Sequence, residues 1–171
     1  LAEKKQTVAI EQEDYDAGKV MGVKKSILYG YRDSGMAGTA DNDHPNAYVQ
    51  VPIDVVVAKV VDTIRELKPQ VVFTFDEGGG YGHPDHIHAS LATKLAYFAA
   101  GDPSYTVSTL APWKPSKLYY HGFPRSIMKT WFAAFAEADP DSDLAKLDVN
   151  EMGVPDELLS TVLDTAPYVD M

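Results

Sequence analysis

Cysteine is absent from this 171-residue sequence. Its absence excludes disulfide bonds, and it also excludes metal sites built from thiolates. Any metal ion that the chain binds must therefore be held by histidine, aspartate or glutamate. Neutral imidazole and carboxylate groups are ligands that suit Zn²⁺.

Positive charge is scarce. Lys and Arg number 15 against 25 Asp and Glu, which gives a net charge of −10. Because the neutralisation of phosphates requires a basic surface, this balance argues against unspecific binding to nucleic acids or anionic membranes. It places no restriction on a small neutral substrate.

Long apolar runs are also absent. No run approaches the roughly 20 residues that span a membrane, and the sequence shows no signal peptide. We therefore expect no membrane span and a cytoplasmic location, and the sequence leaves the formation of a homo-oligomer open. Because the sequence begins with Leu1 rather than Met, we expect that an N-terminal piece is missing.

The composition is that of a globular protein, with 45% apolar and 11% aromatic residues. A chain of this length can form one domain with its own core. Helical periodicity alternates with short apolar stretches, which predicts an α/β fold with a mostly parallel sheet flanked by helices. The predicted helices are 52–68, 84–100 and 124–138, and the predicted strands are 71–75 and 117–121. The residues expected to face inward from the helices are Ile53, Val57, Val60, Ile64 and Leu67, then Ile87, Leu91, Leu95 and Phe98, then Ile127, Met128, Trp131, Phe132 and Phe135.

The remaining segments give weaker signals. Residues 7–21 are expected to form a helix that stops at Gly22, and 26–29 a short strand. The other weak expectations are loops at 103–116 and 139–154, a helix at 155–165 and the start of a strand at 166–171. The polar stretch 30–50 is long for a loop inside a compact domain, so it is either a surface excursion or a functional loop.

The most informative stretch runs from Phe73 to His86. It predicts a buried strand, then a loop in which four of the five residues from Gly78 to Gly82 are glycine, and then a helix. Pro84 suits the first position of that helix, which makes His83 its cap. Open α/β folds keep their sites where strands end and helices begin, so we expect the functional site here.

His83 and His86 are three residues apart, so both can point to the same side of the first helical turn. Of the two, His86 is better placed as a metal ligand because it lies within the helix, whereas His83 could instead act as an acid or as a donor to a developing oxyanion. Asp85 could orient either imidazole. The alternative is that both histidines are polar surface and that Asp85 only complements the helix dipole. The other histidines are expected in solvent or in satisfied polar contacts: His88 in solvent, and His44 and His121 in either.

Several blocks of the sequence closely resemble the LmbE-like, or PIG-L, family of zinc-dependent N-acetylglucosaminyl deacetylases. That family includes the deacetylase of mycothiol metabolism. The block 74–86 is similar to the family's second motif, and the resemblance covers at least residues 26–124. The other blocks that fit the family are 30–39, 42–48, 64–69 and 117–120.

The resemblance implies a Rossmann-like α/β fold, with Zn²⁺ at the carboxyl ends of the strands and an N-acetylated amino sugar as the substrate. It implies that His86 is a zinc ligand, that His83 stabilises the oxyanion or acts as the acid, and that Tyr81 helps to polarise the amide carbonyl. Arg32 and Asp33 are implied as substrate-binding residues, Asp33 through a sugar hydroxyl.

The sequence also departs from the family. The family's first motif, Ala-His-Pro-Asp-Asp-Glu, supplies the other histidine ligand, an aspartate ligand and the general base, and it is absent. Ile10 stands where the family usually has arginine, and the family's later helix containing Lys and His is absent. We therefore expect residues 1–171 to be a single, partial domain that is truncated at both ends.

Two alternatives to a deacetylase stay open. The chain could be a catalytically incomplete fragment that serves as a non-enzymatic scaffold or interaction module. It could also be a different metal-dependent hydrolase, such as a phosphoesterase, which would need more carboxylate ligands and positive groups for phosphate. Apart from Arg32, the loops near the histidines offer few such groups.

Overall fold

The computed structural model describes residues 16–141, 148–150, 152–164 and 166. The chain divides into two compact units, residues 1–32 and 33–171, and each is described by itself. In the first unit, residues 16–20 form a helix that ends in a turn, where Gly22 has a φ of +70°. This confirms the predicted helix stop. The rest of that predicted helix, residues 7–15, lies outside the described residues, as do residues 167–171 of the last predicted strand.

The short strand predicted at 26–29 is absent from the first unit. These residues are assigned neither to a helix nor to a strand, and Ile27 and Leu28 are each 39% exposed. A strand requires a neighbour that pairs its backbone N–H and C=O groups, and local propensity cannot supply one. The prediction was therefore wrong.

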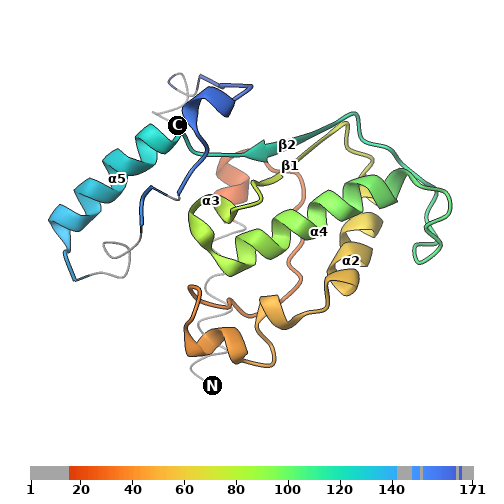
Figure 1. Cartoon of the computed structure of the whole chain (residues 1–171). Coiled ribbons are helices and arrows are strands. Elements are labelled where there is room, and N and C mark those ends of the chain that lie inside the picture. The colour runs from red at the N-terminus through yellow and green to blue at the C-terminus, as the bar shows by residue number, and fades with distance from the viewer. Residues whose placement is uncertain (1–15, 142–147, 151, 165, 167–171) are drawn as a thin grey trace. The chain divides into compact units, whose positions relative to one another are not determined.

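Two parallel strands form the centre of the second unit. β1 (Val71–Phe75) pairs with β2 (Lys117–His121) in a register that places Val71 beside Lys117 and Phe75 beside His121. The connection between the strands contains α4 (Pro84–Gly101), which lies along β1, and α2 (Ile53–Leu67) packs against α4 (Figure 1). This arrangement confirms the predicted α/β fold with a parallel sheet and flanking helices.

The polar stretch before α2 is ordered by two short 3₁₀ helices. They are η1 (Ala40–Asp43) and η2 (Tyr48–Gln50). Pro52 then caps α2, and Lys68 ends it in the left-handed conformation with a φ of 51°. Val57 and Ile64 are buried in α2 as predicted, whereas Leu67 is exposed because it lies in the last turn.

α4 buries a different face from the predicted one. Its buried residues are all small: Ser90, Ala92, Ala96 and Ala100. Small side chains allow α2 and α4 to approach each other closely. The large apolar residues that we predicted to face inward are instead 41% to 67% exposed: Ile87, Leu91, Leu95 and Phe98.

β1 is half-covered rather than buried. Phe73 is 62% exposed, and its ring stacks on that of Tyr119 in β2 with centroids 5.2 Å apart. Successive side chains of a strand point to opposite faces. Val72 and Thr74 on the other face are accordingly more buried than Val71 and Phe73. The prediction of a buried strand was therefore wrong, because Val71 and Phe73 are exposed.

Arg65 is a buried cation that holds the connection after α4. It is 3% exposed, and its guanidinium donates to six backbone carbonyls around the end of α4 and the following loop. The acceptors are the carbonyls of Ala99, Ala100, Asp102, Tyr105, Ser108 and Leu110. The carbonyl ends of a helix attract positive charge, so Arg65 both caps α4 and fixes the predicted loop at 103–116.

The C-terminal part is organised around α5 (Arg125–Ala138). Met128 and Phe132 are buried against Met152, as predicted for the helix, but the rest of its predicted inward set is 42% to 49% exposed: Ile127, Trp131 and Phe135. The helix predicted at 155–165 is only the short η4 (Asp156–Leu158), because Leu159 is extended and residues 160–164 are assigned to no helix. Among the described helices, none combines the length and the apolar character needed to cross a bilayer.

Replacing Arg65 with Lys should lower the free energy of unfolding by about 2–4 kcal/mol. Lys keeps the charge but has a single ammonium group in place of the planar fork, which leaves several buried carbonyls without a donor. Denaturant unfolding measures the loss. Arg125→Lys is the matched control, because the Arg125 guanidinium donates to two carbonyls, those of Met152 and Gly153, rather than six. Equal losses in the two variants would contradict the role given to Arg65.

Replacing Lys68 with Gly should raise the free energy of unfolding by about 0.5–1 kcal/mol. Lys68 has a φ of 51° at the end of α2, and a side chain in this conformation is strained where glycine is not. Thermal unfolding tests the change. The same substitution at Lys129, inside α5, should instead destabilise by about 1 kcal/mol.

Candidate active site

The candidate site lies where β1 ends and α4 begins. After β1 the chain makes a tight turn in which the Asp76 carboxylate accepts from the Gly80 N–H at 2.7 Å. Residues 79–82 then form the short helical turn α3 (Gly79–Gly82), in which Gly80 has a φ of +76° and Tyr81 is also non-helical. The glycines are required because Gly79, Gly80 and Gly82 all have positive φ. This turn delivers both histidines to the carboxyl end of β1.

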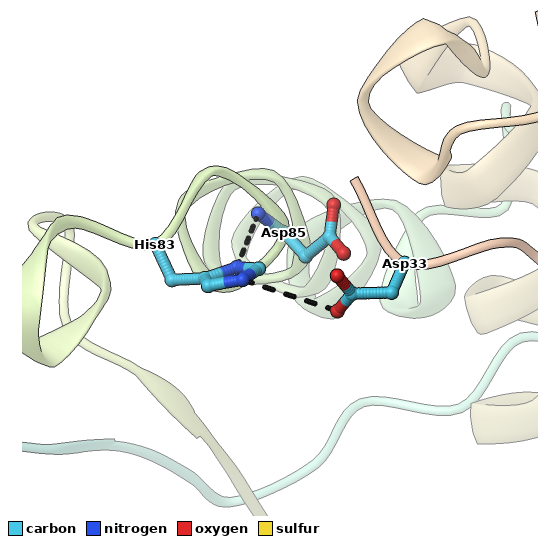
Figure 2. A group of neighbouring side chains, drawn as sticks. All are labelled: Asp33, His83 and Asp85. Atoms are coloured by element: carbon cyan, nitrogen blue, oxygen red, sulfur yellow. Dashed lines mark hydrogen bonds and ion pairs between the residues drawn. The ribbon is translucent and has the colours of Figure 1, made fainter. Parts of the chain in front are cut away.

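His83 caps α4, as predicted. Its Nδ1 accepts from the backbone N–H of Asp85 at 3.2 Å, and the side chain is buried. A nitrogen that accepts carries no proton, so in the neutral ring the proton is on Nε2. That Nε2 lies 3.9 Å from Oδ2 of Asp33 (Figure 2). His83 therefore presents an N–H donor toward the Asp33 side.

His86 is held in the opposite tautomer. Its Nδ1 lies 3.1 Å from the carbonyl oxygen of Gly79. A carbonyl can only accept, so Nδ1 carries the proton and the lone pair is on Nε2. The ring is stacked on that of Phe75, with centroids 4.0 Å apart and planes 4° from parallel. The centroids of the His83 and His86 rings are 4.8 Å apart, so two imidazoles of opposite tautomer are neighbours.

Two carboxylates complete the group. Asp85 accepts from the Ser34 N–H at 3.0 Å through Oδ2, and its Oδ1 is buried with no hydrogen-bond partner among the described residues. Asp33 is different, because its side chain is 77% exposed and its Oδ1 accepts from the Gly35 N–H. Figure 2 shows Asp33 and Asp85 converging with His83, and one ligand atom from each lies within 4.8 Å of the others.

The group of Asp33, His83 and Asp85 has the spacing of a metal site, but the hydrogen bonds favour His86 as the imidazole ligand. Metal binding through His83 Nε2 would require its proton to move to Nδ1, which would break the cap on Asp85. His86 needs no such change, because a carbonyl already holds its Nδ1 proton, as is typical of metal-binding histidines. The unpartnered oxygen of Asp85 belongs to the group with Asp33 and His83.

Tyr81 lies beside both histidines. Its ring is edge-on to that of His86 at 5.2 Å and to that of His83 at 6.1 Å. It also packs against the cluster around Met128 and lines a cavity of about 280 Å³. The other residues that line this cavity are Asp76, Gly78, Gly80, Gly82, Asp148, Met152 and Gly153.

The site therefore brings together most of the residues that the sequence predicts. His83, Asp85 and His86 lie at the start of α4, Tyr81 precedes them, and Asp33 meets them from a distant loop. Arg32 belongs to the other unit and is not part of the site described here for residues 33–171. Asp85 orients the His83 imidazole through its backbone N–H rather than through its side chain. Its carboxylate instead accepts from the Ser34 N–H.

His88 does not face solvent as predicted. Its ring contacts that of Tyr48 with centroids 4.9 Å apart, and its Nε2 is buried without a hydrogen-bond partner among the described residues. The prediction failed because the 33–50 loop covers this side of α4, which no local pattern indicates. His44 accepts from the Asn46 N–H, and His121 is exposed at the end of β2, as expected.

Sequence reasoning missed three groups that shape the site: the Asp76 carboxylate, the Gly79 carbonyl and the Phe75 ring. A carboxylate directly after a strand and before glycines was the available signal for Asp76.

One surface ion pair lies nearby, between Glu77 and Lys94 of α4. The hydrogen bond from Lys94 lowers the pKa of Glu77, and Glu77 in turn raises the pKa of Lys94.

Comparison with known proteins gives a consistent result. The sequence profile of the PIG-L family, described as GlcNAc-PI de-N-acetylase, matches residues 2–97, which is more than half of the chain. Similar curated proteins are named 1D-myo-inositol 2-acetamido-2-deoxy-alpha-D-glucopyranoside deacetylase. The one from Geodermatophilus obscurus is 44% identical over 137 residues, covering 78% of this chain and 47% of the relative. The one from Thermobifida fusca is 40% identical over 140 residues, covering 81% of this chain and 48% of the relative.

The chain spans about half the length of the curated relatives it matches. Among solved structures, a conserved protein from Thermus thermophilus aligns with a TM-score of 0.48 and 23% sequence identity. That alignment covers 74% of this chain and 55% of the other.

Replacing Gly79 with Ala should destabilise the protein by more than about 1 kcal/mol and displace the His86 ring. Gly79 has a φ of +65°, and an added Cβ would lie 2.9 Å from Cβ of His86. Denaturant unfolding and the NMR signals of the His86 ring measure the two effects. Gly78→Ala is the control, because Gly78 has a φ of −85° and its Cβ would meet only Asp76 Oδ1 at 3.7 Å. An unmoved His86 ring in Gly79→Ala would contradict this account.

Proposed function

This chain belongs to the PIG-L family, and from that membership we propose that it carries the catalytic histidines of a metal-dependent hydrolase that removes the N-acetyl group from an N-acetylglucosaminyl-type substrate. The observation that carries the proposal is the pair of opposed tautomers, a donor on His83 Nε2 and a lone pair on His86 Nε2, in rings 4.8 Å apart. Metal-dependent amide hydrolysis uses such a pair, because it combines a group that stabilises the oxyanion with a ligand that holds the metal.

We propose zinc as the metal. The chain has no cysteine, so the donors are imidazole and carboxylate, which suit Zn²⁺. His86 would hold the ion through Nε2, and Asp85 Oδ1 is a buried carboxylate oxygen without a donor among the described residues. A buried carboxylate oxygen without a partner is costly, and a cation would remove that cost. When bound, zinc polarises a carbonyl and lowers the pKa of water to about 7.

We propose the following roles for the other residues of the site. His83 donates its Nε2–H to the oxygen of the acetyl group as negative charge develops there. The Tyr81 hydroxyl is the second donor, since its ring lies beside both imidazoles. Asp33, which is exposed and acceptor-only, binds a hydroxyl of the sugar. Arg32 is proposed to bind the substrate as well, and the cytoplasm is proposed as the compartment.

Substitution of the two histidines should separate metal binding from catalysis. His86→Ala should lose the metal and reduce acetate release at least about 10³-fold, because the imidazole ligand is removed. His83→Asn should keep the metal and lower kcat about 10²–10³-fold, since Asn still caps α4 but has no Nε2–H donor at that position. The measurements are zinc content by elemental analysis and acetate release from an N-acetylglucosaminyl substrate, with the protein expressed from its complete open reading frame.

The two variants serve as controls for each other. Full activity in His86→Ala would end the assignment of the metal ligand. Loss of zinc in His83→Asn, with His86 unchanged, would instead place the ion on the group of Asp33, His83 and Asp85.

A further inference from the structure

The loop that presents Asp33 is built around one side chain, that of Asn42. Its carboxamide nitrogen donates to the carbonyl oxygens of Ser34, Gly35 and Met36, those of Gly35 and Met36 at 3.4 Å and 3.1 Å. Its carboxamide oxygen accepts from the Gly38 N–H at 2.8 Å. One side chain thus ties together four backbone groups of the turn that follows Asp33.

The turn itself has no regular secondary structure that could replace these bonds. Gly35 has a φ of +69°, and a Cβ there would lie 2.7 Å from the Thr39 hydroxyl, so the chain is folded tightly on itself. The Thr39 hydroxyl donates to the Met36 carbonyl at 2.9 Å. Asp33 Oδ1 accepts from the Gly35 N–H, which couples the Asp33 side chain to the shape of the turn.

Ser34 connects this turn to the site. It is fully buried, and all three of its polar groups are bonded. Its N–H donates to the Asp85 carboxylate, its hydroxyl accepts from the Val49 N–H, and its carbonyl accepts from Asn42. Asn42 and Asp85 therefore hold Ser34 from opposite sides, and Asp33 is the residue next to it.

We propose that Asn42 is a positioning residue that sets the affinity of the site for hydroxyl-bearing amino sugars, because it fixes Asp33 opposite the Nε2 of His83. This inference rests on the proposed function of Asp33. Asn42 does not reach the reacting atoms, so its loss affects the binding of the sugar and not the chemistry of the amide. A displacement of about 1 Å in a binding group can cost up to about 10²-fold in efficiency.

The test is Asn42→Asp, which has nearly the same shape and keeps an acceptor for Gly38 but replaces the donor with a carboxylate oxygen that faces three carbonyls. With an N-acetylglucosaminyl substrate we expect KM to rise about 10–100-fold, kcat to stay within about 3-fold, and zinc content to be unchanged. Asn46→Asp is the matched control, because Asn46 is an exposed residue of the same loop. Its backbone N–H donates to His44, and the substitution leaves that group in place. Its KM should be unchanged.

A double-mutant cycle with Asp33→Ala asks whether Asn42 acts through Asp33. If it does, the double variant has the same KM as Asp33→Ala, because the binding group is already gone. The inference is overturned if the increases in KM of the two single variants multiply in the double variant. It is also overturned if Asn42→Asp leaves KM unchanged.

A binding measurement separates this inference from the proposed function. Titration of the protein with N-acetylglucosamine, followed by NMR, requires no catalysis. If Asn42→Asp binds the sugar more weakly than Asn46→Asp does, the inference is supported, whether or not the parent protein releases acetate. A parent protein that releases no acetate counts against the proposed function alone. Equal binding by the two variants counts against the inference whether or not the parent is active.

Discussion

The hydrogen bond from the Asp85 N–H to Nδ1 of His83 is the interaction on which the chemistry of the site depends. It closes the first turn of α4, where backbone N–H groups would otherwise lack acceptors. It also fixes the proton of the neutral His83 ring on Nε2. One turn later the Gly79 carbonyl fixes the His86 proton on Nδ1. Backbone groups thus assign opposite roles to two identical side chains three residues apart.

The rest of the second unit keeps this turn in place. Ser90 donates to the carbonyl of Phe75, which joins α4 to the end of β1. Alanines on another face of α4 allow α2 to pack closely, and the Arg65 guanidinium holds the far end of α4 through backbone carbonyls. The histidines therefore stand on a helix that is fixed at both ends, which is the arrangement that a preorganised site requires.

The part of the site that carries Asp33 is built differently. Asp33 lies on a loop without strands or long helices, and its position depends on the side-chain bonds of Asn42 and Ser34. The loop is tied to the start of α4 by the hydrogen bond from the Ser34 N–H to the Asp85 carboxylate. Within this site, a helix start that is fixed by packing carries the histidines, and a separately braced turn carries Asp33.

The sequence by itself determined the elements whose signals are local. Proline and a histidine cap mark the start of α4, positive-φ glycines mark the turn before it, and apolar periodicity marks α2, β1 and β2. It also determined that His83, Asp85 and His86 share one turn. Only the tertiary structure decided which face of α4 is buried, since a large apolar stripe and a stripe of alanines compete and the packing of α2 selects the alanines. Only the tertiary structure brought Ser34 to Asp85, 51 residues away, and Arg65 to the loop about 40 residues beyond it. Such contacts join polar groups that are far apart in the chain, and no local pattern of charge or hydrophobicity specifies their partners.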